Sequence, residues 1–426
     1  MVIDVRAGTA STLRIATAGS VDDGKSTLIG RLLHDTKTVF EDQLQAVVKA
    51  SRRYGDGSTN LALLTDGLRA EREQGITIDV AYRYFATPKR SFIVADTPGH
   101  AQYTRNMVTG ASTSDIAIVL VDARHGVVEQ TRRHALIASL LGVQHIVLAV
   151  NKMDLVDWQQ SVYLAVVDDL QRFVRALDNP VPVTAIPMSA LLGDNVVDGS
   201  QFTPWYDGPP LLTFLEDLET RAHTDLGARV HVQRVIRPQG GDHADFRGQA
   251  GVVSGGWLRN GDDVIIQPSG KKATIGGLYR WGSPVDEAGP GHAVVVELTT
   301  DVDVARGDVF VSTGATPPLV GDEVEADICW MIDRPLSTGS RWWFKHGTRA
   351  GQAVVTEVLY AIDPTTLEQH GADELNLNEL GRIRLQLGEA IVADPYHVLP
   401  ETGRMILIDP ADNNTAGAAM IRSLVG

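Results

Sequence analysis

The first half of the chain alternates short apolar runs with segments whose apolar residues recur at helical spacing. The apolar runs predict buried strands at residues 12–19, 91–99, 115–123, 145–152 and 181–190. Helices are predicted between them at residues 26–33, 101–113, 129–141 and 158–177. Because the runs are apolar on both faces, they indicate a mostly parallel sheet covered by helices on both sides.

The pattern changes near residue 225, after which helical spacing nearly disappears. Short alternating strands follow, separated by Gly-, Pro- and Asp-rich turns, as in GVVSGGWLRNGDDVIIQPSGKKATI. This pattern is typical of antiparallel barrels or sandwiches, and residues 312–323 (STGATPPLVGDE) are predicted to connect two such units. We therefore predict an α/β domain over residues 1–224, followed by two all-β barrel domains over residues 225–317 and 318–426.

Length, charge and hydropathy narrow the class of protein. A chain of 426 residues is long enough for two to four domains. It carries 38 Lys and Arg against 53 Asp and Glu, a net charge of −15, and no basic run, which argues against a nucleic-acid partner. The N-terminus does not read as a signal peptide, and no stretch reaches about 18 apolar residues, so we expect a cytoplasmic protein without a membrane segment.

The single cysteine, a pair of tryptophans and two histidines are expected to have structural rather than catalytic roles. The single cysteine, Cys329, excludes an intrachain disulfide and a cysteine metal cluster, and its apolar surroundings predict a buried thiol. Trp342 and Trp343 are expected to pack inside a barrel, with a partner-docking patch as the alternative. His125 and His134 are nine residues apart and off one helical face, so we expect both on the surface.

The segment GSVDDGKST, residues 19–27, follows the first predicted strand and opens the first predicted helix. Its spacing is that of a loop that wraps phosphates, because backbone N–H groups can point inward at an anion beside a helix N-terminus. Lys25 is expected to reach the β- and γ-phosphates, and the Ser26 hydroxyl is expected to ligate Mg²⁺. The residues expected to bind the nucleotide here are Gly19, Ser20, Val21, Asp22, Asp23, Gly24, Lys25, Ser26 and Thr27.

A second group of polar residues follows the strand that ends in FIVAD. Asp96 is placed there to hold Mg²⁺ through water, and Gly99 allows close approach of a backbone N–H to a γ-phosphate. Ligands of open parallel sheets bind at the carboxyl ends of the strands, so this placement agrees with the phosphate loop.

The identity of the base is predicted from the next two strand ends. Residues 151–154 (Asn151, Lys152, Met153 and Asp154) follow the strand IVLAV, and the Asp154 carboxylate can accept both guanine donors, N1–H and the 2-amino group. Adenine lacks that pair of donors. Ser189, Ala190 and Leu191 follow a further strand, and the Ala190 N–H is expected to meet the guanine O6. These features predict GTP and GDP rather than ATP.

With GSVDDGKST, DTPGH and NKMD followed by two β domains, the chain resembles the translational GTPases related to elongation factor Tu. Within that group it is similar to the GTPase (large) subunits of bacterial sulfate adenylyltransferase. The similar stretches are GSVDDGKSTLIGRLLHDTK, LTDGLRAEREQGITIDVAYRYF, ADTPGHAQYTRNMVTGAS, VDARHGVVEQTRRH, LNLNELGRIRL and TGRMILIDPADNNTAGAAMI. The resemblance implies a heterodimer with a small catalytic subunit that carries the ATP–sulfate chemistry. Together they make adenosine 5′-phosphosulfate and diphosphate in sulfate assimilation, driven by GTP hydrolysis.

The resemblance also implies roles for two residues near the phosphates. Thr77, in EREQGITID, matches the first switch as a Mg²⁺ ligand and γ-phosphate sensor. His100 matches the water-orienting histidine of these factors, and no glutamine follows Gly99 to take that role. Lys25, Thr77 and His100 are therefore the expected catalytic residues.

Two acids inside the phosphate loop call for a physical explanation. Two carboxylates within ~6 Å of a triphosphate would cost a few kcal/mol each at an intermediate dielectric. One is therefore expected to turn outward or to share a cation with the phosphates. Elongation-factor-like loops carry an Asp at the position of Asp22, so we expect Asp22 to help bind a monovalent cation or water. Asp23 is expected to face the switches or the partner.

Two other functions fit the sequence less well. A translation factor that delivers aminoacyl-tRNA is disfavoured by the net negative charge and by the lack of a basic face. It is also disfavoured by the sequences of the segments GSVDDGKS and TDGLRAEREQ. A bifunctional enzyme that also phosphorylates adenosine phosphosulfate would need a second phosphate loop after the β domains, and the sequence given contains none.

Overall fold

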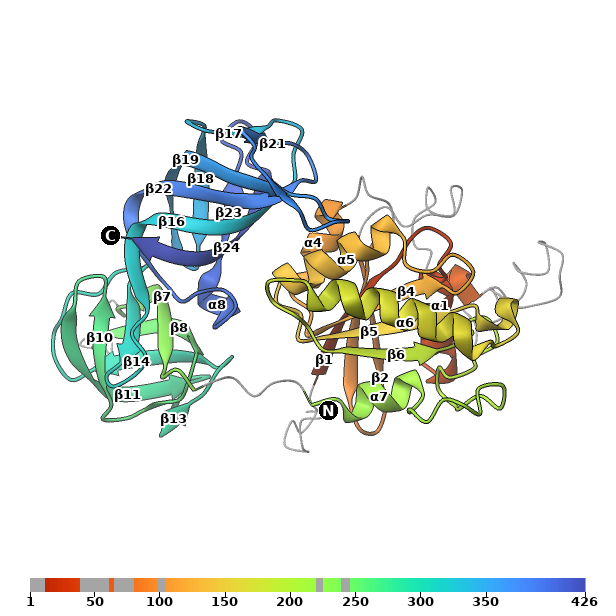
Figure 1. Ribbon diagram of the computed structural model, residues 1–426. Coiled ribbons are helices and arrows are strands. Elements are labelled where there is room, and N and C mark those ends of the chain that lie inside the picture. The colour runs from red at the N-terminus through yellow and green to blue at the C-terminus, as the bar shows by residue number, and fades with distance from the viewer. Residues whose placement is uncertain are drawn as a thin grey trace. The chain divides into compact units, whose positions relative to one another are not determined.

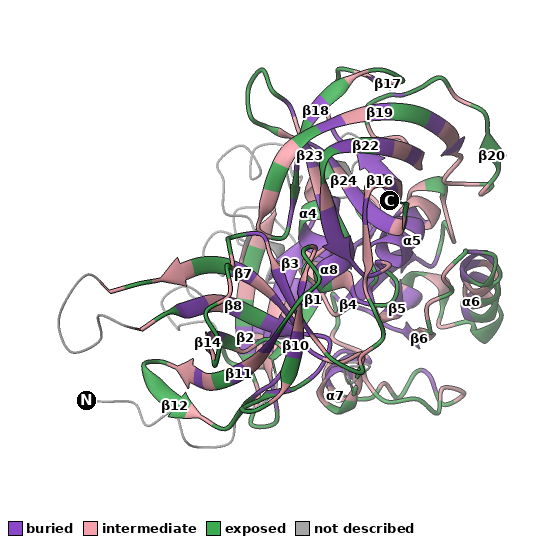
Figure 2. Ribbon diagram, turned by 90° about the vertical axis from the view of Figure 1, so that its left-hand side faces the viewer, coloured by how far each residue is buried: buried purple, intermediate pink, exposed green. Residues whose placement is uncertain are grey.

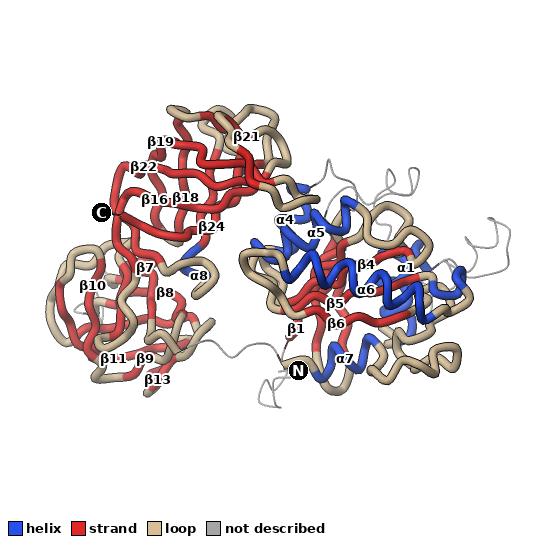
Figure 3. The backbone as a smooth tube through the Cα atoms, viewed as in Figure 1, coloured by secondary structure: helices blue, strands red, loops and turns tan. Residues whose placement is uncertain are grey.

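The computed structural model describes residues 12–38, 61–64, 80–98, 104–219, 225–238 and 246–425 (Figure 1). The chain divides into two compact units. One comprises Met1–Thr220 with Pro364–Glu368, and the other comprises Arg221–Asp363 with Gln369–Gly426. The described helices lie almost entirely in the first unit, whereas strands dominate the second (Figure 3). The limits of the three predicted domains stay a prediction.

A six-stranded sheet in the order β2-β3-β1-β4-β5-β6 forms the centre of the first unit. Its strands are β1 (Thr12–Ala18), β2 (Ala81–Ala86), β3 (Ser91–Asp96), β4 (Ile116–Asp122), β5 (His145–Asn151) and β6 (Val183–Pro187). All neighbours run parallel except β2 and β3, which confirms the mostly parallel sheet. Every residue of β4 is buried, as Figure 2 shows in purple, because helices and other strands cover this central strand on all sides.

Helices pack against this sheet along their apolar faces. They are α1 (Lys25–Asp35), α4 (Thr104–Ala111), α5 (Glu129–Leu140), α6 (Gln160–Arg175) and α7 (Leu211–Asp217), with the 3-10 turns η1 (Leu61–Leu64) and η3 (Met153–Val156). In α6 the buried residues Tyr163, Val166, Leu170, Phe173 and Val174 follow helical spacing. The predicted start of this helix at residue 158 is too early, because Asp157 and Trp158 have positive φ. Among the helices that the structure describes, none is long and apolar enough to cross a membrane.

The second unit contains two antiparallel sheets, each closed into a barrel. The first has the order β10-β15-β7-β8-β14-β11-β12, and pairing of β10 with β11 closes it. Its strands are β7 (Arg229–Ile236), β8 (Gly248–Ser254), β10 (Asp263–Gln267), β11 (Lys271–Arg280), β12 (Ser283–Val285), β14 (Ala293–Leu298) and β15 (Val309–Ser312), and the short strands β9 (Leu258–Arg259) and β13 (Glu287–Ala288) pair beside it.

The second barrel has the order β18-β23-β24-β16-β22-β19-β20 and is closed by β18 pairing with β19. Its strands are β16 (Leu319–Trp330), β18 (Arg341–His346), β19 (Arg349–Ile362), β20 (Gln369–His370), β22 (Leu380–Ala393), β23 (Arg404–Ile408) and β24 (Thr415–Val425). The short strands β17 (Leu336–Ser337) and β21 (Glu374–Leu375) and the helical turn α8 (Pro400–Gly403) complete it. The prediction of two β-barrels after an α/β domain is confirmed.

The predicted connector over residues 312–323 is longer than the real one. Strand β15 ends at Ser312 and β16 begins at Leu319, so only residues 313–318 connect them. The remainder belongs to β16, because Leu319 pairs with Ala393 of β22. The turn-like composition of this segment concealed a strand whose partner lies far along the sequence.

In the second barrel, the predicted burial of Cys329 is confirmed, whereas the predicted packing of the two tryptophans is confirmed for Trp342 only. Cys329 is buried, and burial raises the pKa of its thiol to about 12. Trp342 packs in the barrel core, with its ring 4.7 Å from that of Trp330. Trp343 is 42% exposed, so the packing interpretation is wrong for this residue. Consecutive residues of a strand point to opposite faces, which separates the two tryptophans.

Candidate nucleotide-binding site

The loop of residues 19–27 joins β1 to α1 at the carboxyl edge of the sheet. Gly24 caps the helix with a φ of 94°, a left-handed conformation that favours glycine. A Cβ at this position would lie 2.5 Å from Asn151 Nδ2, so the loop also needs glycine for space. Glycine is therefore required at position 24 both by the backbone conformation and by the lack of space beside Asn151.

Lys25 directs a buried ammonium group into this loop. Its Nζ donates to the carbonyl oxygens of Gly19 and Ser20 at 2.8 and 2.9 Å, and these are its only hydrogen-bond acceptors among the described residues. An ammonium has three N–H donors, so one remains for a phosphate oxygen. Burial lowers the pKa of Lys25, and the carboxylates of Asp96 and Asp23 oppose that shift.

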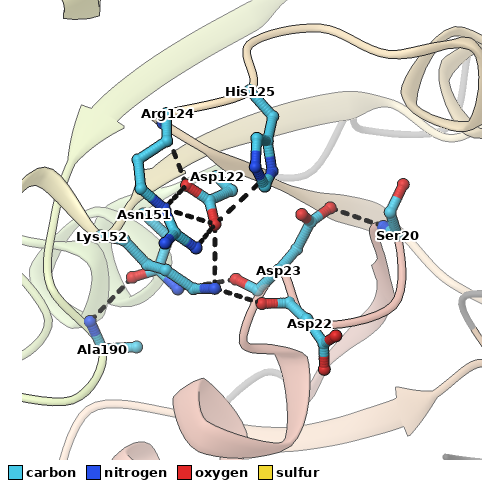
Figure 4. Close-up of polar contacts among 9 residues, drawn as sticks. All are labelled: Ser20, Asp22, Asp23, Asp122, Arg124, His125, Asn151, Lys152 and Ala190. Carbon is cyan, nitrogen blue, oxygen red and sulfur yellow. Dashed lines mark hydrogen bonds and ion pairs between the residues drawn. The ribbon is translucent and has the colours of Figure 1, made fainter. Parts of the chain in front are cut away.

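The two acids of the loop lie in different environments. Asp22 is exposed, with a φ of 69°. Asp23 is 6% exposed, and its Oδ2 accepts a hydrogen bond from the Ser20 N–H at 2.6 Å. In Figure 4 the Asp23 carboxylate points toward Ser20, whereas that of Asp22 points away from the network. The carboxylate of Asp23 is thus held by the loop itself, and the expectation that it faces the switches or the partner stays a prediction.

Asn151, at the end of β5, connects the loop to the segment after β6. Its Nδ2 donates to the Asp23 carbonyl at 2.7 Å, and its Oδ1 accepts from the Ala190 N–H at 2.9 Å (Figure 4). The Ala190 N–H, which was expected to meet guanine O6, is thus donated to Asn151 here. Ser189 is buried and Leu191 is 54% exposed. The three segments meet at one edge of the sheet, as their positions at strand ends predicted.

A charged network centred on Asp122 was missed by the sequence reasoning. Its Oδ2 lies 2.9 Å from Lys152 Nζ and 2.6 Å from the guanidinium of Arg124, and Lys152 also donates to the carbonyl of Asp22. Burial favours the neutral acid, but hydrogen bonds from Arg124 and Lys152 outweigh it and hold the pKa of Asp122 far below its usual range. Its position at the end of the buried strand β4, like that of Asp96 on β3, was the available signal.

The residues expected at the metal and at the base lie near the same strand ends. Asp96 is 2% exposed and ends β3, beside Thr17 of β1, whose Oγ1 donates to it at 3.4 Å. Ser26 lies in the first turn of α1, and Asp154 is half-buried in η3. Val21 is exposed and Thr27 is half-buried. Thr77, Gly99 and His100 lie outside the described residues.

His134 is buried, contrary to the expectation of a surface residue. It is 1% exposed on α5, its Nε2 lies 2.9 Å from Gln130 Nε2, and its Nδ1 has no partner among the described residues. Burial and the nearby charges of Lys25 and Arg133 lower its pKa to about 3, so this side chain is neutral. His125 is exposed, as expected.

These residues fit a nucleotide with Mg²⁺. A buried ammonium with a donor to spare and a loop that opens a helix suit a polyphosphate. Within the described ranges, no three His, Cys, Asp or Glu side chains gather around a point that could hold a metal. Asp96 and the Ser26 hydroxyl supply oxygen atoms at the strand and helix ends, and proteins bind Mg²⁺ through one or two carboxylates together with phosphates and water.

The chain is similar in sequence to several known proteins. Residues 10–224 match the family described as "Elongation factor Tu GTP binding domain", and residues 323–422 match "GTP-eEF1A C-terminal domain-like". A "Bifunctional enzyme CysN/CysC" of Mycobacterium tuberculosis is 53% identical over 96% of this chain and 67% of its own length. A "Sulfate adenylyltransferase subunit 1" of Tolumonas auensis is 49% identical over 96% of this chain and 86% of its own. A crystal structure of sup35 complexed with GDP is 22% identical, covers 98% of this chain and 95% of that one, and has a TM-score of 0.44.

Proposed function

We propose a function for this chain from the premise that it belongs to the sulfate adenylyltransferase subunit 1 family, whose members carry an elongation factor Tu-type GTP-binding domain. The chain is a GTPase and a subunit of sulfate adenylyltransferase. Its hydrolysis of GTP is coupled to the formation of adenosine 5′-phosphosulfate and diphosphate from ATP and sulfate, in sulfate assimilation. The observation that carries this function is the phosphate loop with its buried Lys25, in a chain 47–53% identical to named relatives. Delivery of aminoacyl-tRNA is less supported.

The roles of the individual residues are part of the proposal. Lys25 holds the β- and γ-phosphates, and Ser26 and Asp96 hold Mg²⁺, which neutralises phosphate charge when bound. Asp154 accepts the guanine donors, and Asn151 keeps its segment against the phosphate loop. These roles are supported by the meeting of the segments at one sheet edge.

Three residues are proposed from the family motifs alone. Thr77 would ligate Mg²⁺ and sense the γ-phosphate, Gly99 would offer its N–H to that phosphate, and His100 would orient the attacking water. In these roles they would all act on the γ-phosphate or its attacking water. A cytoplasmic location also stays a prediction.

A monovalent cation beside Asp22 is the remaining part of the proposed site. Its support is that the Asp22 carboxylate is exposed and outside the ion-pair network, so it is available to a cation shared with the phosphates. Replacing Asp22 by Ala should remove the K⁺ dependence of GTP hydrolysis. An unchanged K⁺ dependence would exclude this role.

The proposed partner is a smaller subunit that carries the ATP–sulfate chemistry. The experiment reconstitutes the two chains and measures adenosine 5′-phosphosulfate formation with and without GTP. We expect GTP to raise product formation in the complex of wild-type subunits. Lys25→Ala should abolish that increase, because the point charge on the β- and γ-oxygens is lost. Co-purification with tRNA and no effect of GTP on sulfate adenylation would contradict the proposal.

A further inference from the structure

The carboxylate of Asp23 is built into the phosphate loop on several sides. Its Oδ2 accepts the Ser20 N–H at 2.6 Å, while the Asp23 N–H donates to the Ser20 carbonyl at 3.3 Å. The Asp23 carbonyl in turn accepts from Asn151 Nδ2 at 2.7 Å. Side chain, N–H and carbonyl of one residue are therefore all engaged, and the first half of the loop is fixed through Ser20.

This carboxylate also places charge where the loop must receive phosphate. It is 6% exposed; the charges of Lys25 and Lys152 stabilise its ionised form, and the charge of Asp122 opposes it. Burial raises the pKa of Asp23 above its usual value, because keeping the carboxylate ionised in this buried place costs free energy. Asp22 lies next to it in sequence, but solvent screens its exposed carboxylate.

We propose that Asp23 is a positioning residue with two opposing effects on the nucleotide. Its hydrogen bond to Ser20 holds the phosphate loop in its shape, and its negative charge competes with the phosphates for Lys25. The charge weakens nucleotide binding and therefore raises the dissociation rate of GDP. This inference rests on the proposed function, because it concerns the same guanine nucleotide.

Two substitutions separate the hydrogen bond from the charge. Asp23→Asn keeps an oxygen that can accept the Ser20 N–H and removes the charge. Asp23→Ala removes both. Asp168→Asn is the matched control, because it removes one negative charge from an exposed carboxylate on α6.

The readouts are the dissociation rate of a fluorescent GDP analogue, followed by stopped flow, and the melting temperature of the nucleotide-free protein. Asp23→Asn should slow GDP release by about tenfold, because a like charge near the phosphates is removed in a partly buried site. Asp23→Ala should melt at a lower temperature than Asp23→Asn, because the Ser20 N–H loses its acceptor.

GDP release from Asp23→Asn at the wild-type rate or faster would overturn the inference. If that variant does not fold, Asp23→Ser supplies a neutral side chain with a hydroxyl acceptor, and the same slower release is required of it. Failure of the wild-type protein to bind guanine nucleotides would instead refute the proposed function. The two failures are thus distinguished by the wild-type titration.

Discussion

A single carboxylate, that of Asp154, is proposed to set the choice of base. Asp154→Asn should shift the preference from GTP to XTP, because xanthine carries an oxygen where guanine has its amino group and an amide can donate to it. The dissociation constants of both nucleotides measure this shift. Asp157→Asn, three residues further on and exposed, is the control. A retained preference for GTP would show that Asp154 does not read the base.

Two histidines that are largely shielded from water should make the protein sensitive to acid. His134 is buried and His231 is half-buried, and desolvation is the main cause that lowers the pKa of each to about 3. The unfolded chain takes up these protons near pH 6.5 and the folded chain does not, so stability is complete above pH 6.5 and falls below it. At pH 5 each histidine should cost about 2 kcal/mol of unfolding free energy.

Urea denaturation at pH 7.5 and pH 5.0 measures this loss. His231→Gln should lose less stability between the two pH values than the wild type does, whatever its absolute stability. His125→Gln, which changes an exposed histidine, should keep the wild-type pH dependence. Equal losses in all three proteins would assign the acid sensitivity to other groups.

At the scale of elements, the start of α1 depends on contact with the end of β5. Gly24→Ala would place a Cβ 2.5 Å from Asn151 Nδ2 at a residue with a φ of 94°. Asn151 would have to move, which breaks its bonds to the loop and to Ala190. We expect GTP affinity to fall at least about tenfold, from a strain of ~1–3 kcal/mol and the lost contacts.

A matched glycine separates strain from the steric clash. Gly126 also has a positive φ, of 69°, but nothing lies within 4 Å of a Cβ built there. Gly126→Ala should therefore carry the backbone strain without displacing a neighbour. Comparable losses of GTP affinity in the two variants would show that the contact with Asn151 is unimportant.

At the scale of the whole molecule, a buried ion pair joins the two barrels of the second unit. Arg229 NH2 lies 3.3 Å from Asp394 Oδ1, both side chains are at most 5% exposed, and Thr402 donates to Asp394 at 2.8 Å. Arg229→Ala should cost about 3–5 kcal/mol of unfolding free energy, because Asp394 is left buried without its cation. Denaturation of the single variants and of Arg229→Met with Asp394→Leu tests this, since the apolar pair should recover most of the loss.

Coupling to the partner is also a property of the whole molecule. A GTPase that drives another reaction must not hydrolyse freely, so we expect slow hydrolysis by the isolated chain and faster hydrolysis in the complex with ATP and sulfate. If those substrates favour the GTP-bound state, GTP must tighten their binding by the same factor. Titrations of ATP with GTP, GDP or no nucleotide on this chain measure that factor. Identical ATP affinities would rule out coupling through binding.

Much of the fold and of the site followed from local sequence patterns. The five parallel strands of the sheet and the helix after the phosphate loop were found because burial on both faces requires continuous apolar runs, whereas the half-exposed edge strand β2 shows no such run. The segments around Lys25, Asp96 and Asn151 were placed together because parallel strands end at one edge. The Asp122 network was not found, because an acid at a strand end does not show which cations will reach it.

The sequence by itself determined the order of elements, the guanine-nucleotide motifs and the family, since each depends on residues close together in the chain. The tertiary structure decided that Asp23 is buried, that Asp22 is exposed, and that His134 faces the interior. The physical reason is that burial depends on what packs against a side chain, and those neighbours come from distant segments. Asn151, which holds the backbone of Asp23, lies 128 residues further along the chain.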